Sequence, residues 1–439
     1  MIIINLLNIT QMKVKHLLSA YLLIAAFLLN SIMDAGAQSE NGNGSNGSYY
    51  TITGVVKDKA SKKTIEHVNV SALGTNVGTI TNEDGEFTLK ISNTLKVSDI
   101  QLSCIGYFNA LIAIKDNSTD NNIFYMAPES FVLNEVQVFS WQNPRELVRA
   151  AIEKIDENYP MKANTLTGFY RETIQKRRRY INISEAVIEI YKDAYNRPAD
   201  RDQIKVLKGR KLLSPKVADT LSVKLLGGPN IPIYLDIIKN PDVLLDIESL
   251  QFYSFKIGET TSIDDRLHYT VHFEPMMILD YPLYTGTFYI DRATLSFTRA
   301  EFKMDMSNKS KVTNTILKQK PMGLRFTPEE VSYIVTYKQQ DNKTYLNYIR
   351  NEIKFKCDWK RRLFATSYEV MGETVITDRN DQNASRIPSK ETFSIRQSLS
   401  HEVTLYQDDD FWSSYNIIEP TESLENAVNK LKKQNIKSQ

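Results

Sequence analysis

The sequence predicts a mainly β protein with two folded regions, a small N-terminal β-sandwich and a larger α+β domain with a curved antiparallel sheet and a few helices. Three observations indicate this fold class. Short β-rich runs alternate with turn residues from Tyr50 onward. Longer runs of alternating apolar and polar residues dominate from 165 to 406, and a helix with clear ends stands between the two sets.

The first 37 residues have the composition of a secretory signal peptide. Two lysines precede the apolar run Leu17–Leu29, and Ala35-Gly36-Ala37 provides the small residues that favour cleavage before Gln38. The run is about 13 residues long, short of the roughly 20 needed to cross a bilayer as a helix. We therefore predict a signal peptide at 1–37 and an exported protein, periplasmic or associated with the outer membrane, without a transmembrane span after cleavage. The sequence leaves open which methionine starts the chain, Met1 or Met12.

A flexible linker is predicted at 38–49, because Ser39–Ser48 contains only small and polar residues. The sandwich is predicted at 50–128. Its strand-like runs are Thr51–Lys57, His67–Leu73, Glu86–Ile91, Ile100–Cys104 and Ala110–Ile114. A turn is expected at Thr81–Gly85. Glu83 and Asp84 in this turn are conceivable calcium ligands, but one acidic turn without a second ligand cluster favours a plain turn.

A linker and a capped helix are predicted at 129–160. Asn143 suits the N-cap, Pro144 suits the first helical position, and Glu146 stands three residues after the cap, as in a capping box. The helix should end at Asn158-Tyr159-Pro160. Its apolar stripe contains Leu147, Val148, Ala151, Ile152 and Ile155.

The strand-rich α+β domain is predicted at 161–407. Further runs with strand character are Thr285–Asp291, Leu295–Met304, Val331–Lys338, Tyr345–Lys356 and Phe364–Thr377. The segment Lys211–Leu226 is less regular and suits short helices. A C-terminal tail is predicted at 408–439, with a helix that opens at Pro420-Thr421. The apolar residues of that helix are Leu424, Ala427, Val428 and Leu431.

The charge balance excludes a general attraction to nucleic acid. Lys and Arg number 54 against 52 acidic residues, which gives a net charge of +2. The two cysteines, Cys104 and Cys357, are each interpreted as small buried apolar residues, and whether they form a disulfide is left open.

Motifs of the common enzyme classes are missing from the sequence. There is no HExxH, GxSxG, Walker or GxGxxG motif. The strongest polar group is His268, His272 and Glu274, which share one face of a predicted strand. His272 and Glu274 are close enough for one metal ion, but His268 lies about 13 Å from His272, so a polar strand face is the simpler interpretation. We predict no catalytic, cofactor-binding or metal-binding residues.

Three surface features suggest contacts. Lys176-Arg177-Arg178-Arg179 is expected at a hairpin tip, either simply solvated or in contact with anionic lipopolysaccharide, lipid or an acidic partner. Tyr281, Tyr284 and Tyr289 either line a groove for glycan or lipid or are half-buried sheet residues. Asp219-Thr220-Leu221 resembles the O-glycosylation site of Bacteroidetes envelope proteins.

Several turn motifs of the first region resemble the carboxypeptidase regulatory-like domain, a transthyretin-like or Ig-like sandwich that precedes many TonB-dependent receptors of Bacteroidetes. The matching residues are Ile52–Asp58, Val68–Val70, Gly74-Thr75, Gly78-Thr79, Asp84–Phe87 and Ile105–Tyr107. In the second region, Gly168–Glu172 and Asn416–Ser423 resemble exported Bacteroidetes proteins with the same layout. Gly286–Asp291 resembles the periplasmic lipoprotein-carrier fold, a curved sheet that holds acyl chains.

These features favour a non-catalytic envelope protein that binds or assembles a lipid, a glycan or a protein partner on a curved sheet, with peripheral membrane association as an option. One alternative is a hydrolase that uses carboxylates such as Glu274. Another is a purely structural surface protein or an accessory of a TonB-dependent system. The sequence does not determine the ligand, the oligomeric state or the membrane face.

Overall fold

The computed structural model describes residues 49–114, 118–129, 141–225, 227–359, 364–405 and 411–438. The predicted signal peptide, the linker up to Ser48 and the Asp408–Asp410 run lie outside the described residues. The described part is mainly β, with small N-terminal sheets followed by a large sheet and a few helices, as predicted. None of its helices has the length and apolar character needed to cross a membrane.

The N-terminal sandwich consists of two small sheets. One sheet has the strand order β4-β1-β7, with bounds Glu86–Ser92, Tyr49–Asp58 and Ser118–Met126. The other has the order β3-β2-β5-β6, with bounds Gly78–Ile80, Asn69–Ala72, Asp99–Ser103 and Ala110–Ala113. The strand-like runs predicted from the sequence do not include β3 or β7. Strand β3 is only three residues long, and β7 begins with polar residues, so neither has a clear strand pattern.

The turn between β3 and β4 has the predicted form. Gly85 has a φ of +76°, and a Cβ at this position would lie 2.8 Å from the carbonyl oxygen of Val56. The side chain of Asn82 stabilises the turn by accepting hydrogen bonds from the backbone N–H groups of Asp84 and Glu86. A left-handed glycine and an Asn that bonds its own turn are therefore what reverse the chain here.

The helix that precedes the large sheet begins as predicted, but the structure divides the predicted segment into two helices at Lys154. Helix α2 spans Pro144–Glu153, and Asn143 caps it by accepting a hydrogen bond from the backbone N–H of Arg145 at 3.0 Å. A short helix, α3, follows over Ile155–Asn158. The buried residues of α2 belong to the predicted stripe and are Leu147, Val148 and Ala151.

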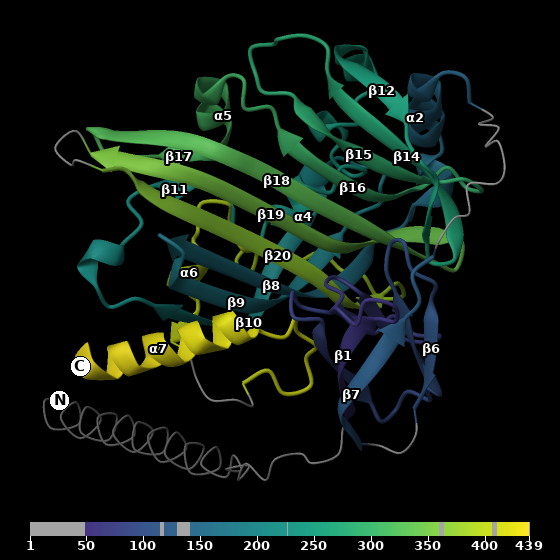
Figure 1. The fold of residues 1–439 in the computed structure, drawn as a ribbon, viewed down its shortest axis with the longest axis horizontal. Helices are drawn as coiled ribbons and strands as arrows, with labels where there is room; N and C mark the ends of the chain where they lie inside the picture. The colour runs from purple at the N-terminus through teal and green to yellow at the C-terminus, as the bar shows by residue number, and fades with distance from the viewer. Residues whose placement is uncertain are drawn as a thin grey trace, which may run out of the picture. The chain divides into compact units, whose positions relative to one another are not determined.

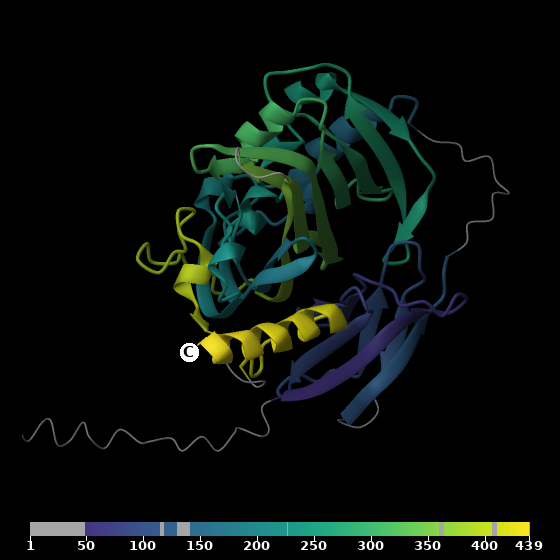
Figure 2. The ribbon, with the colours of Figure 1, turned by 60° about the vertical axis from the view of Figure 1, so that its left-hand side comes forward.

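The large sheet has twelve strands in the order β12-β14-β15-β16-β18-β19-β20-β8-β9-β10-β21, with β13 paired to β14 (Figure 1). Its first strands are β8 Asn164–Lys176, β9 Arg179–Lys192, β10 Gln203–Leu213, β12 Tyr253–Ile257, β13 Thr261–Ile263 and β14 Arg266–Pro275. The others are β15 Tyr284–Asp291, β16 Phe297–Met304, β18 Leu324–Gln340, β19 Lys343–Trp359, β20 Thr366–Asn380 and β21 Thr404–Leu405. All neighbours are antiparallel except β10 and β21, and Figure 2 shows that the sheet is curved.

One face of the sheet, here called the apolar face, carries the main core. Val271, Phe288, Ala300, Val335 and Ile349 are directly paired in register across β14 to β19, and all are buried. Three helices pack against this face and contribute to the same core. They are α2, α4 (Ile231–Tyr234) and α5 (Lys309–Ile316). Burial of so many apolar side chains is the main stabilising contribution in this part of the fold.

A buried charged cluster anchors the segment around α4 beside this core. The Nζ of Lys192 lies 3.0 Å from Asp202 Oδ2 and 2.7 Å from Asp236 Oδ2. Tyr337 and Tyr195 donate hydrogen bonds to the Asp236 carboxylate. Burial by itself lowers the pKa of Lys192, but the two carboxylates outweigh it and raise the pKa to about 12. The lysine therefore stays charged and links β9 to the segment that covers the apolar face.

The opposite face, here called the polar face, carries a buried row of alternating charges. Arg350, Glu373, Arg171, Glu185 and Arg210 are directly paired on β19, β20, β8, β9 and β10. Arg171 Nε lies 2.9 Å from Glu185 Oε1, and Arg210 Nε lies 2.7 Å from Glu185 Oε2. Burial alone would raise the pKa of Glu185, but the two arginines hold it below its usual value.

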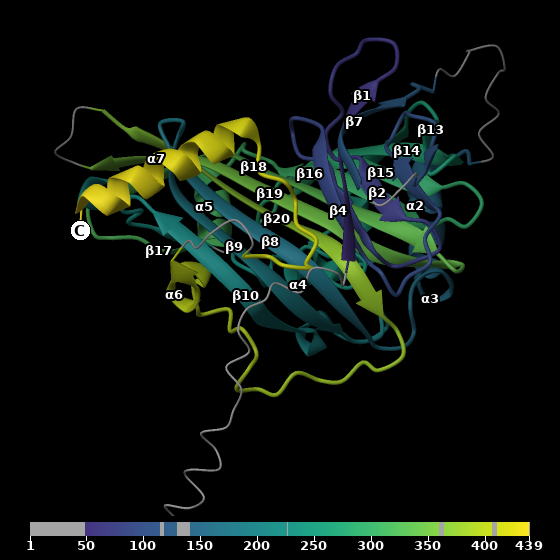
Figure 3. The ribbon, with the colours of Figure 1, turned by 90° about the horizontal axis from the view of Figure 1, so that it is seen from below.

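The C-terminal segment covers this charged row. Arg171 Nη2 donates a 2.7 Å hydrogen bond to the carbonyl oxygen of Ile418, and Trp412 packs edge-on against Phe169. Helix α7, Glu422–Ser438, then crosses β9 and β10 (Figure 3). Its packing confirms the predicted apolar stripe, whose buried members are Leu424, Val428 and Leu431.

The sandwich contacts the same covered half of the polar face. The ring of His67 lies 5.4 Å from that of Tyr348, and Arg350 Nη2 pairs with Glu83 Oε1 at 3.0 Å. Asp84 Oδ2 accepts a hydrogen bond from the backbone N–H of Glu422. Both acidic side chains of the turn therefore bind protein groups, which gives no support to the calcium hypothesis.

Replacing the central arginine of the row should destabilise the protein strongly. In Arg171→Met, Glu185 and Glu373 would lose a buried cationic partner, and we expect the free energy of unfolding to fall by about 3–5 kcal/mol. Urea denaturation measures this change. Arg149→Met removes an exposed ion pair to Glu146 and serves as the control, with an expected change below about 0.5 kcal/mol. Equal unfolding midpoints for the two variants would contradict the structural role of the row.

His67 should make stability depend on pH. Burial, with Arg350 and Arg299 nearby, lowers the pKa of His67 to about 3, so the folded state holds the imidazole neutral. The unfolded chain binds the proton near pH 6.5, so this stability is present above pH 6.5 and is lost as the pH falls toward 3. We expect His67→Gln to reduce the loss in unfolding free energy between pH 7 and pH 5 by up to about 2 kcal/mol. Urea denaturation of the wild type and the variant at pH 7 and pH 5 measures this difference.

Candidate functional site: a hollow on the polar face

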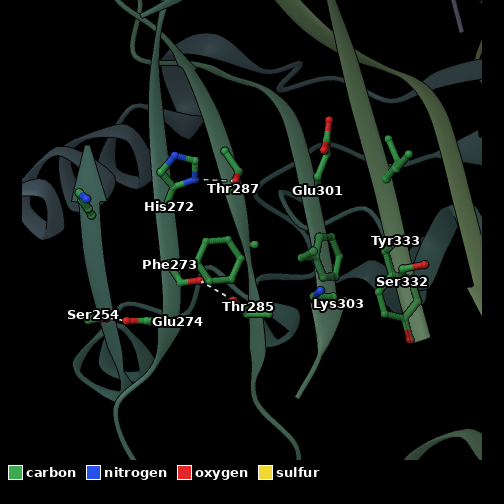
Figure 4. A pocket seen from close by; sticks show the side chains of 14 residues that line it. Ser254, His272, Phe273, Glu274, Thr285, Thr287, Glu301, Lys303, Ser332 and Tyr333 are labelled. Atoms are coloured by element: carbon green, nitrogen blue, oxygen red, sulfur yellow. Dashed lines mark hydrogen bonds between the residues drawn. The ribbon is translucent and has the colours of Figure 1, made fainter. Parts of the chain in front are cut away.

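A hollow lies on the half of the polar face that the sandwich and C-terminal segment leave uncovered. Its volume is about 710 Å³, and β12, β14, β15, β16 and β18 form it (Figure 4). Its polar lining consists of Ser254, Lys256, His272, Glu274, Thr285, Thr287, Glu301, Lys303 and Ser332. Strand alternation explains this composition, because every second residue of each strand points to the polar face.

The centre of the hollow continues the buried charged row. His272 pairs with Thr287, Thr287 with Glu301, and Glu301 with Ile334. Ile334 in turn pairs with Arg350, the first member of the charged row. One line of directly opposed residues therefore crosses the sheet, buried at one end and open to solvent at the other.

Hydrogen bonds orient part of the lining. His272 Nδ1 lies 2.9 Å from Thr287 Oγ1, and Ser254 Oγ donates to Glu274 Oε1 at 3.3 Å. Arg299 Nε lies 2.5 Å from Glu301 Oε1, which holds that carboxylate at the side of the hollow. Lys256 on β12 and Lys303 on β16 are exposed. The site therefore presents donors, acceptors and charges of both signs.

Apolar groups also line the hollow. Ile334 is half-buried and stands on the polar face, next to Glu301 in register. Phe273, Phe302 and Tyr333 also border the hollow, but they alternate with the polar residues, and their side chains are buried in the core of the apolar face. Gly286 pairs with Phe273 and Phe302 and leaves no side chain at this point of the sheet, where a Cβ would lie 2.7 Å from the Cβ of Phe302. The lining of the hollow is therefore mainly polar.

The structure places two of the three residues of the predicted polar group in the hollow. His272 and Glu274 line it, whereas His268 is buried and contacts Asp291, with Nε2 3.9 Å from Oδ2. Burial lowers the pKa of His268. No cluster of three or more His, Cys, Asp or Glu side chains suited to a metal is found among the described residues. His272 and Glu274 instead bond to Thr287 and Ser254, so nothing in the geometry favours a metal site.

Sequence reasoning missed Thr287, Glu301 and Lys303. The alternation pattern does place each of them on the polar side of a predicted strand. Those runs do not show which strands are neighbours in the sheet, so sequence alone could not assemble the residues into one site.

The tyrosines singled out in the sequence do not line the hollow. Tyr281 is exposed in the β14–β15 loop, and Tyr284 and Tyr289 are half-buried in the sheet. Lys176–Arg179 forms the predicted hairpin tip between β8 and β9. Asp219, the first residue of the glycosylation-like motif, is buried and pairs with Lys176 and Arg179.

Both cysteines are free thiols. Cys357 is buried as predicted, but Cys104 is only half-buried, at the edge of the sandwich core. Burial raises the pKa of each thiol to about 11, so both are protonated at neutral pH.

Comparison with solved structures gives distant matches that involve the second region. A crystal structure of a domain assigned to outer membrane lipoprotein sorting, from Vibrio parahaemolyticus, has 11% identity and a TM-score of 0.24 over 56% of this chain and 95% of that one. A LolA superfamily protein from Nitrosomonas europaea has 13% identity and a TM-score of 0.19, over 54% and 97%. Lipovitellin has 12% identity and a TM-score of 0.25, over 57% and 28%.

The resemblance of the second region to these structures is a distant one. At such low identities and TM-scores it supports no conclusion about what the chain binds. No curated protein matches the sequence. One family does match, over the sandwich and the residues that follow it. Residues 52–138 are a CarboxypepD_reg-like domain, in agreement with the turn motifs that predicted it.

Proposed function

We propose that this chain is a non-catalytic binding protein of the cell envelope whose hollow on the polar face holds a glycan. The observation that carries the proposal is the 710 Å³ hollow with its lining of hydroxyl, imidazole, ammonium and carboxylate groups. Sugar hydroxyls both donate and accept hydrogen bonds. A glycan therefore complements the donors and acceptors of the lining.

A buried acyl chain fits this structure less well. The apolar face, where a carrier would hold it, is largely filled by side chains of α2, α4, α5 and the sheet, and the cavity lined by Tyr170, Glu172 and Val370 on this face has a volume of only about 130 Å³. An acyl chain in the hollow would remove charged groups such as Lys256, Glu274 and Lys303 from water, which is unfavourable. The largely filled apolar face thus favours the glycan among the ligands considered from the sequence.

The hydrolase alternative has less support from the geometry. Glu274 and Glu301 both face the hollow, but Glu274 is exposed and the side chain of Glu301 is 40% exposed and paired with Arg299. A carboxylic acid that protonates a leaving group at neutral pH usually lies in an enclosed, apolar environment. Neither side chain has such an environment.

The proposal predicts that a bulky side chain at the centre of the hollow blocks binding. Thr287 lies between His272 and Glu301, so Thr287→Trp fills the site, and a strand tolerates the aromatic ring. The measurement is native mass spectrometry of the full chain isolated from the envelope fraction of the cells that produce it. We expect an oligosaccharide adduct on the wild type, and at least a tenfold loss of the adduct in Thr287→Trp.

Thr315→Trp is the matched control, because Thr315 is exposed on α5 and outside the hollow. This variant should retain the adduct, and thermal unfolding checks that both variants fold. A wild-type chain without any adduct would contradict the proposal. A lipid adduct that Thr287→Trp does not remove would contradict the choice of ligand and site.

A further inference from the structure

Four chain reversals meet at one end of the large sheet, here called the basic end. The β8–β9 turn lies at Lys176–Arg179, and Lys176 pairs with Tyr368 near the start of β20. Leu324, at the start of β18, pairs with Trp359 at the end of β19. Figure 1 shows these strand ends together on the left. The loop after β10 and the end of α7 join them, since Asn435 donates a hydrogen bond to the carbonyl oxygen of Leu213.

Cations are concentrated at the basic end. Its exposed basic residues are Arg177, Arg178, Lys216, Lys320, Arg325 and Lys433. The acidic residues nearest to them are mostly paired with basic groups. Asp219 is buried and paired with Lys176 and Arg179, Glu329 is paired with Lys356, and Asp358 stands opposite Arg325 in register. The exposed charge of this end is therefore positive, although the chain as a whole is almost neutral.

Exposed apolar side chains lie among these cations. Among the described residues, five large apolar side chains are more than 70% exposed. Four of them are at the basic end: Val217 at 91%, Met322 at 99%, Phe364 at 77% and Ile436 at 74%. Full exposure of such side chains is unfavourable in water, so their concentration at one end indicates a surface that is covered in function.

The turn at the tip has an unfavourable sequence for its backbone. Arg177 and Arg178 have φ values of 51° and 62°, so both adopt the left-handed conformation of a two-residue hairpin turn that favours Asn and Gly. The same conformation occurs in this chain at Asp264-Asp265 and at Asp341-Asn342, where the residues suit it. Local folding therefore does not explain two arginines at this tip, and strained positions of this kind occur at functional sites.

We propose that the basic end docks on the surface of an anionic phospholipid bilayer. The arginines of the tip contact lipid phosphates, while Met322 and Phe364 insert among the acyl chains. Basic and apolar groups together give stable peripheral binding, whereas either alone is weak. This docking is independent of the glycan proposal, because no residue of the basic end lines the hollow.

Vesicle sedimentation of the full chain tests the docking. Vesicles of phosphatidylethanolamine and phosphatidylglycerol should bind the protein, and phosphatidylcholine vesicles should bind it at least tenfold less. Raising NaCl from about 0.05 M to about 0.5 M should weaken binding, because salt screens the phosphate contacts. Absence of binding to the anionic vesicles would overturn the proposal and would leave an acidic protein as the partner to seek.

Variants separate docking from folding. R177N/R178G removes two charges but gives the turn its preferred residues, so it should fold normally and lower vesicle binding roughly 10- to 30-fold. R177K/R178K should retain binding. The control K59Q/K162Q removes two exposed lysines elsewhere and should change binding less than about threefold. Equal loss in R177N/R178G and K59Q/K162Q would show a non-specific charge effect and would overturn the assignment.

A second set of variants tests how much the exposed apolar side chains contribute to vesicle binding. Met322→Ser and Phe364→Ser each remove an exposed apolar group at the basic end, and each should lower binding at least about threefold. Ile278→Ser removes a group that is 82% exposed in the β14–β15 loop, and it should have no effect. If Ile278→Ser lowers binding as much as the other two changes, the protein does not dock through the basic end.

Discussion

The covered half of the polar face depends on the charged row Arg350–Glu373–Arg171–Glu185–Arg210. Charges of alternating sign on neighbouring strands satisfy one another in the register of the sheet. Such a row is stable away from water only if further hydrogen bonds complete it, and the carbonyl oxygens of Ile418 and Glu419 accept those bonds from Arg171. The C-terminal segment therefore has a defined position because a buried arginine requires it.

This constraint also determines where a ligand has room. The sandwich, the C-terminal segment and α7 occupy the polar face over β19 to β10, so its other half, over β12 to β18, stays open. The residue line that continues the charged row becomes the centre of the hollow, where Thr287 and Glu301 lie. The apolar face leaves less room, because helices and core side chains occupy most of it.

The hollow and the basic end occupy different parts of the same sheet. The hollow is lined by every second side chain of its strands, so it follows from strand alternation. The basic end is formed by loops between strands, whose residues need no partners within the sheet and can carry unpaired charges. A protein held at a bilayer through Arg177, Arg178, Met322 and Phe364 would still present the hollow to a ligand. The two proposals are therefore compatible, and each can fail without the other.

The sequence by itself determined the local features. The cap at Asn143, the turn at Gly85, the alternation in β14 and the apolar stripe of α7 follow from short-range rules, and the structure has all of them. Only the tertiary structure decided that Glu301 joins His272, that His268 is buried, and that Arg171 lies beneath Ile418. The physical reason is that strand order and register depend on contacts between residues far apart in the chain, which alternation within one strand does not encode.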